Sequence, residues 1–302
     1  MINSKALLSA CGAIILLLTP VVGAAVPKVI TWGGNSPAWN RVLHLAALRL
    51  GCSDPPSGCA DYAQQLSRSQ GVDKVFLAIL LRADRTPDEA REYSRLSLSH
   101  PALFEVGFDD FVGQCERQSK EPAAVSPLLI EIASSLKSAN PNLHLGITIY
   151  EDELGSSSFP LRRLDSQFRK SVDFVHLYPH YRKESQSYAT SVQLAKELFP
   201  AAQIIAGIYA YDRRDYLPCA QGSSTPCTDQ EEVSLFSQSL KERVAVVNEQ
   251  GANWIEFYPG GFGNEEKLNI WKEPRGCLPE RQHECVQNTK AMREVVRQVL
   301  SQ

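Results

Sequence analysis

The sequence alternates between short apolar runs and longer amphipathic segments. Seven runs are rich in aliphatic, β-branched and aromatic residues and have the length of buried strands: 28–34, 74–82, 103–111, 143–154, 173–182, 203–213 and 253–261. Strands that are apolar on both faces are typical of a parallel sheet covered by helices. The alternation therefore constrains the chain to an α/β fold.

The segments between these runs space their apolar residues as helices do. Six are clear: 38–51, 86–100, 125–141, 187–200, 231–251 and 289–302. Thr86 and Pro87 suit the N-cap and first position of the second helix. We predict a (β/α)8 TIM-type barrel with one weak or missing strand. A doubly wound open sheet is the alternative, but no Gly-rich phosphate loop follows the first run.

The first residues differ from the rest of the chain. A short basic start, "MINSK", precedes a long apolar stretch and the small residues of "VGAAVPK". This pattern predicts a secretory signal peptide over residues 1–25, cut after Ala24 or Ala25, and one barrel domain over residues 26–302. An uncleaved signal anchor and a lipoprotein site at Cys11 are the alternatives. We expect a bacterial periplasmic or secreted protein with no stable membrane association after cleavage.

Cysteine spacing agrees with export. Six cysteines beyond the leader form three local pairs, which predict the disulfides Cys52–Cys59, Cys219–Cys227 and Cys277–Cys285 across short polar loops. Zinc sites more often use Cys-x-x-Cys spacing, so metal binding is the weaker interpretation. Cys115 is left over, and we expect a buried free thiol.

Polar and aromatic residues gather where the apolar runs end. They are Trp32, Asp109, Asp110, Tyr150, Glu151, Glu153, Tyr178, His180, Tyr209, Asp212, Glu256 and Tyr258. In a parallel barrel these ends meet on the face that carries active sites. Aromatic faces can stack on sugar rings, and carboxylates can serve as acid and base in glycoside cleavage. We therefore predict a carbohydrate substrate, with Asp109, Asp110, Glu151 and Glu256 as catalytic candidates and the others as substrate-binding residues.

No other partner or cofactor is indicated. The formal net charge is −3 and the pI is near 6.1. These values give no electrostatic reason to expect a nucleic-acid partner. We expect no cofactor and no metal, and the sequence gives no indication of the oligomeric state.

The adjacent aspartates in "GFDDF" carry a family resemblance. The motif resembles the catalytic pair of glycoside hydrolase family 84 and, more loosely, other barrels that cleave N-acetylhexosaminides by substrate assistance. The resemblance implies that the substrate's acetamido carbonyl is the nucleophile, that Asp109 orients it and that Asp110 protonates the leaving oxygen. Two carboxylates this close do not easily ionise together, so one pKa should rise.

Other chemistries remain open from the sequence. Asp110 could work with Glu151, Glu153 or Glu256 in a retaining or inverting mechanism. A metal-dependent polysaccharide deacetylase is suggested by "HLYPH", but in a strand His176 and His180 would lie about 13 Å apart. We expect His176 to be a core residue and His180 to contact substrate. A barrel that binds carbohydrate without turnover is the remaining alternative.

Overall fold

The strands form a closed parallel barrel. The computed structural model describes residues 27–53, 55–250, 254–267 and 277–301. Their strands pair in chain order, and the last pairs with the first. The bounds are β1 Lys28–Trp32, β2 Leu45–Gly51, β3 Val75–Ile79, β4 Leu103–Phe108, β5 His144–Tyr150, β6 Phe174–Tyr178, β7 Gln203–Tyr209 and β8 Trp254–Tyr258. The predicted (β/α)8 barrel is confirmed and the open sheet excluded, while the predicted signal peptide lies outside the described residues.

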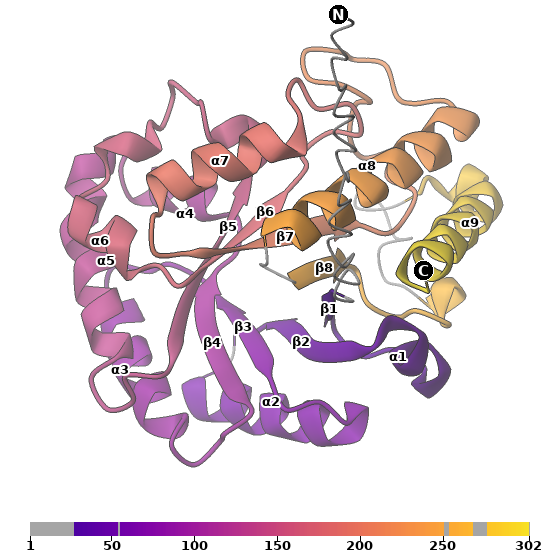
Figure 1. Cartoon of the computed structure of the whole chain (residues 1–302). Coiled ribbons are helices and arrows are strands. Elements are labelled where there is room, and N and C mark those ends of the chain that lie inside the picture. Colours follow the sequence, from indigo (N-terminus) through magenta and orange to yellow (C-terminus); the bar gives the residue numbers. More distant parts are fainter. Residues whose placement is uncertain (1–26, 54, 251–253, 268–276, 302) are drawn as a thin grey trace, which may run out of the picture.

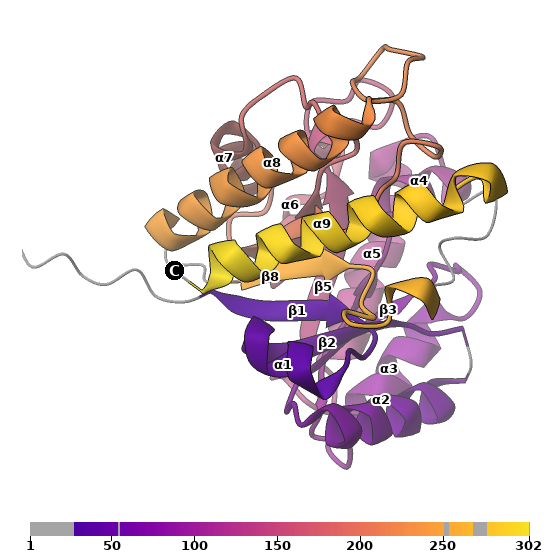
Figure 2. The ribbon, with the colours of Figure 1, turned by 90° about the vertical axis from the view of Figure 1, so that its right-hand side faces the viewer.

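Helices surround the barrel (Figure 1). They are α1 Pro37–Leu43, α2 Pro56–Gln70, α3 Thr86–Leu96, α4 Phe111–Gln118, α5 Pro122–Leu136, α6 Ser166–Ser171, α7 Tyr188–Leu198, α8 Asp229–Gln250 and α9 Gln282–Leu300. Short 3₁₀ turns lie at Glu151–Glu153, Leu161–Arg163, Glu265–Lys267 and Pro279–Arg281. Figure 2 shows α8 and α9 side by side on the outside of the barrel. Within the described part of the chain, no helix combines the length and apolar character that crossing a bilayer requires.

The strand that the sequence did not reveal is β2. The single helix predicted over residues 38–51 is wrong, because the chain forms α1 and then β2 there. His44 ends α1 in the left-handed region, at φ 48°. The residues of β2 are mostly Leu, Ala and Arg, which favour helices in isolation. Pairing with β1 and β3 overrides that preference and places Arg49 inside the barrel.

The three predicted disulfides are present. The structure joins Cys52 to Cys59, Cys219 to Cys227 and Cys277 to Cys285, and Cys115 is buried with a free thiol. The local setting differs from a simple loop in two cases. Cys59 lies in the first turn of α2 and Cys285 in the first turn of α9, so these two bridges tie a loop to the helix that follows it.

The barrel interior is divided along its axis. The large apolar core lies between the strands and the helices, and a smaller cluster fills the interior with Ile30, Ala47, Phe76, Phe174, Ile205 and Trp254. Four fully buried charged residues, Arg49, Glu105, His176 and Glu256, also lie inside. Gly146 provides the space for one of them, because a Cβ there would overlap the Glu105 carboxylate. The interior is therefore charged beneath the face where the strands end.

Candidate active site

A pocket opens at the carboxyl ends of the strands. Its volume is about 160 Å³, and its lining residues come from β1, β4, β5, β6, β7, β8 and the segments that follow them: Trp32, Asp109, Asp110, Thr148, Tyr150, Tyr178, His180, Tyr209, Tyr211, Tyr216, Leu217 and Tyr258. Sites that enclose drug-sized ligands span roughly 300–1,000 Å³. This pocket is therefore smaller than that range.

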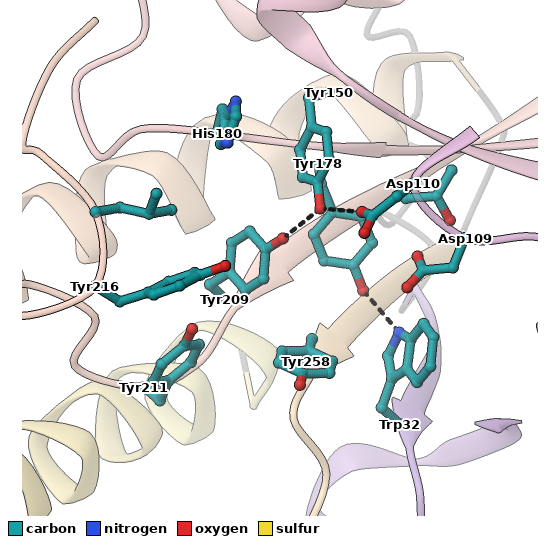
Figure 3. A pocket seen from close by; sticks show the side chains of 12 residues that line it. Trp32, Asp109, Asp110, Tyr150, Tyr178, His180, Tyr209, Tyr211, Tyr216 and Tyr258 are labelled. Atoms are coloured by element: carbon teal, nitrogen blue, oxygen red, sulfur yellow. Dashed lines mark hydrogen bonds between the residues drawn. The ribbon is translucent and has the colours of Figure 1, made fainter. Parts of the chain in front are cut away.

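The aspartate pair forms one side of the pocket. Figure 3 shows both carboxylates on that side, with Tyr211 and Tyr216 on the other. Asp109 follows β4 and is partly buried, while Asp110 is exposed and has a left-handed backbone with φ 44°. The turn at Asp110 lets two successive side chains face the pocket, which an extended strand would not allow.

The two aspartates have different electrostatic surroundings. Burial raises the pKa of Asp109 above its usual value, Arg49 opposes the rise and Asp110 adds to it. Asp110 instead accepts a hydrogen bond of 2.6 Å from the Tyr150 hydroxyl. The expected rise of one pKa therefore falls on Asp109, and the proton is favoured on the more buried member of the pair.

Tyrosines make up much of the remaining wall. The Tyr209 hydroxyl donates to that of Tyr150 at 3.2 Å, and the His180 ring stacks on Tyr150 with centroids 4.7 Å apart. Burial raises the pKa of Tyr150 and of Tyr209 above their usual values. These phenols therefore remain protonated and present rings and hydroxyl groups to the pocket.

The pocket floor rests on a buried carboxylate. Glu256 is fully buried, and its Oε1 accepts hydrogen bonds from Trp32 Nε1 at 2.7 Å and from the Tyr178 hydroxyl at 2.6 Å. Arg49 and His176 also contact this carboxylate. Burial alone would raise the pKa of Glu256. Arg49, followed by His176 and Tyr178, outweighs that effect and lowers the pKa to about 2.

Most of the predicted residues meet at this pocket. Trp32, Asp109, Asp110, Tyr150, Tyr178, His180, Tyr209 and Tyr258 line it. Glu256 lies beneath it and does not line it. Sequence reasoning missed Thr148, Tyr216 and Leu217 among the lining residues, although Thr148 shares the inward parity of Tyr150 on β5.

Three further predicted carboxylates lie outside the pocket. Glu151 points away from the barrel axis, is ion-paired with Arg243 and lines a second pocket beside α7 and α8. Glu153 accepts a hydrogen bond from the Tyr150 backbone at 2.9 Å, and Asp212 is buried against Arg214. These side chains support the loops at the barrel mouth.

The side chains do not favour the metal-dependent alternative. His176 places its Nδ1 against Glu256 and its Nε2 against Glu105, while His180 contacts Asp152. Among the described residues, the one group of three possible metal ligands is Asp215, Cys277 and Cys285, and a disulfide joins its two cysteines. The two histidines of "HLYPH" therefore serve different local networks.

The fold is shared with solved structures. The chain is similar to a GH18 chitinase from Pseudoalteromonas aurantia, with 13% identity, a TM-score of 0.50, and 89% of this chain and 99% of that chain covered. It is also similar to an exo-beta-1,4-mannosidase from Opitutaceae bacterium strain TAV5, with 9% identity, a TM-score of 0.54, and 91% of this chain and 61% of that chain covered. A xylanase from Paenibacillus barcinonensis is similar with 11% identity, a TM-score of 0.53, and 83% of this chain and 88% of that chain covered. These identities establish the fold alone. No protein-family model and no curated protein matches the sequence.

Proposed function

We propose that the protein is an exported glycoside hydrolase that cleaves a poly- or oligosaccharide with the Asp109–Asp110 pair. The observation that carries this proposal is the pocket itself, in which two adjacent carboxylates face a wall of tyrosines at the carboxyl end of a barrel. Solved chitinase, mannosidase and xylanase structures with a similar fold support it. The three disulfides are consistent with an oxidising compartment.

The placement of the carboxylates favours substrate assistance. Retaining and inverting mechanisms use two carboxyl groups that flank the scissile bond. Among the described residues, the carboxylates that line the pocket are Asp109 and Asp110, both at the end of β4. A tyrosinate nucleophile is disfavoured because burial raises the pKa of Tyr150 and Tyr209. An N-acetylhexosaminide supplies its own nucleophile, so no second carboxylate is needed on the opposite side of the scissile bond.

The reaction then needs one acid and one orienting group. The acetamido carbonyl oxygen attacks C1 as the glycosidic bond breaks, and the leaving oxygen takes a proton from an aspartic acid. In the second step water attacks C1 of the cyclic intermediate and gives a proton to the same carboxylate. The bond between C1 and the acetamido oxygen breaks, and the free sugar is released. The raised pKa of Asp109 suits it to hold the proton, whereas Asp110 has the Tyr150 hydroxyl to stabilise an ionised carboxylate. We therefore assign the acid to Asp109, the reverse of what the family resemblance implies.

Leaving-group dependence tests both the function and the assignment. Wild type is assayed on aryl and oligomeric N-acetylhexosaminides, with glucosides, mannosides and xylosides beside them. Asp109→Asn should lose roughly 10²–10⁴ in rate on oligomers and recover much of it on aryl glycosides that leave without a proton. Asp110→Asn should slow both substrates alike.

Three other results have a clear meaning. The opposite pattern for the two variants would restore the assignment that the resemblance implies. Activity within about tenfold of wild type in both folded variants would overturn the proposed mechanism. Saturable sugar binding without turnover of any substrate would establish a non-catalytic barrel.

A further inference from the structure

A layer of four charged side chains crosses the barrel beneath the pocket. Arg49, Glu105, His176 and Glu256 come from β2, β4, β6 and β8, and all four are fully buried. Layers contributed by alternate strands are usual in these barrels, but branched apolar residues usually fill them. Buried charges are costly unless they are paired and hydrogen-bonded. This charge layer therefore needs an explanation beyond packing.

With both carboxylates ionised, the charges of the layer balance when His176 is an imidazolium. One guanidinium and two carboxylates leave a net charge of −1. His176 Nδ1 lies 2.5 Å from Glu256 Oε2, and its Nε2 lies 3.1 Å from both Glu105 oxygens. A neutral imidazole would turn one lone pair toward a carboxylate, whereas an imidazolium donates from both nitrogens. Burial and Arg49 oppose the charge, and the apolar ring of Phe76 lies edge-on to the imidazole with centroids 5.7 Å apart.

The layer is connected directly to the pocket. Glu256 Oε1 accepts hydrogen bonds from Trp32, Tyr178 and Arg49, at 2.7, 2.6 and 2.9 Å. The second amino group of Arg49 donates to the Thr148 hydroxyl at 2.6 Å. Trp32, Tyr178 and Thr148 all line the pocket. The orientation of one buried carboxylate therefore fixes much of the pocket floor.

We propose that Glu256 is a positioning residue, held by Arg49 and by the imidazolium of His176, and that it keeps Trp32 and Tyr178 in place as the pocket floor only while His176 is protonated. The geometry is independent of the reaction. The consequence for substrate binding rests on the proposed function, so the first tests use protein without substrate.

Nitrogen-15 NMR of the full protein measures the protonation directly. His176 should show two N–H groups at pH 7.5, where an ordinary histidine of pKa about 6.5 is neutral. The indole N–H resonance of Trp32, assigned with Trp32→Phe, should shift as His176 loses its proton at higher pH. A single N–H on His176 at pH 7.5, or a Trp32 resonance that ignores this titration, overturns the proposal whatever the enzymatic activity is.

Glu105→Gln tests the coupling without touching Glu256. It removes one of the two carboxylates that face the imidazolium, so the Trp32 transition should move to lower pH. If Glu105→Gln unfolds the protein, Glu105→Asp is used instead. It keeps the negative charge, so the pH of its Trp32 transition should stay close to that of wild type. A transition that stays in place in a folded Glu105→Gln variant contradicts the proposal.

Activity separates positioning from stability. Glu256→Gln should raise KM by about tenfold, close to the loss of one hydrogen bond to a charged group. Glu151→Gln is the matched control, because it also removes a buried ion-paired carboxylate, but one whose partner Arg243 lies outside the barrel. It should lower the unfolding temperature and leave KM and the Trp32 resonance unchanged. Equal effects of both variants on KM would assign Glu256 a structural role only.

Discussion

The Tyr150 hydroxyl donates a hydrogen bond of 2.6 Å to the Asp110 carboxylate, across the ends of β5 and β4. Asp109, the preceding residue, is more buried, and burial raises its pKa. Burial thus favours the proton on Asp109, while the Tyr150 hydroxyl donates to the carboxylate beside it. Pairs of this kind allow one group to hold a proton while the other is ionised.

Tyr150→Phe should therefore impair the site through Asp110. The change removes a hydroxyl that stabilises the carboxylate and keeps the ring that stacks on His180. We expect kcat/KM to fall by about tenfold or more, since hydrogen bonds to charged groups contribute roughly 1.5–3 kcal/mol. Steady-state kinetics checks this, with Tyr62→Phe on the exposed face of α2 as the control. An unchanged kcat/KM in Tyr150→Phe would show that this bond is dispensable.

The pH profile should report the proton on Asp109. An acid catalyst is active while protonated, so activity is present below its folded pKa and lost as pH rises through that value. Burial sets this pKa above the usual range, and the charge of Asp110 raises it further. In Asp110→Asn that contribution disappears, and the alkaline limb of residual activity should move to lower pH. A limb that stays in place would exclude Asp109 as its source.

The sequence predicts the face of the site better than its individual roles. Parallel strands must end on one face, so the aspartates and tyrosines at the run ends were correctly brought to the same mouth. Glu151 differs because it begins the 3₁₀ turn after β5, where its side chain pairs with Arg243 and does not face the pocket. Arg243 lies in α8, far from Glu151 in the sequence, so no local sequence pattern predicts this ion pair.

The buried charge layer was the least predictable feature. Arg49 lies in a segment whose residues favour a helix, so its inward position appears only when β2 pairs with β1 and β3. Glu105 on β4 has the same parity as Asp109, which follows the strand, and this signal is present in the sequence. What it cannot show is that four charges from alternate strands meet at one level, because that depends on the register of the closed barrel.

Gly207→Ala should disturb the pocket floor. Gly207 lies on β7, and a Cβ there would overlap the ring of Tyr178. Overpacking of this kind typically costs 1–3 kcal/mol, so we expect a loss of roughly that size in urea unfolding. Gly155→Ala is the control, because its Cβ would meet nothing within 4 Å. Equal stability of both variants would mean that the Tyr178 ring moves aside freely.

Cys115 should be inert in the folded protein. It is buried in α4, and burial raises the pKa of its thiol, so the reactive thiolate is disfavoured. A thiol reagent at pH 8 should modify it only after unfolding, and peptide mapping without reduction should recover the three disulfides. Rapid labelling of Cys115 in native protein would contradict the buried position.

Stability should depend on pH through the charge layer. Arg49, the strongest of the lowering partners, and His176 bring the folded pKa of Glu256 to about 2, against the burial that favours the neutral form. Its contribution is therefore present above the ordinary value of about 4.3 and is lost as pH falls toward 2. His176 has a raised folded pKa, so its contribution is present below about 6.5 and is lost as pH rises through the raised value.

Together these shifts place the strongest contribution of the layer between about pH 4.3 and 6.5, with losses on both sides. Urea midpoints at pH 3, 5.5 and 9 measure it, and unfolding slopes that match across pH ensure that the same transition is compared. In Glu256→Gln the acid loss should shrink, because the titrating carboxylate is gone. The alkaline loss should shrink too, because His176 then lacks one of its two carboxylate partners.

Asp173, which pairs with Lys137 near the opposite end of the barrel and also has a lowered pKa, supplies the control. Asp173→Asn should reduce only the loss of stability at acid pH. If the loss of stability at alkaline pH persists in full in Glu256→Gln, that loss arises outside the charge layer.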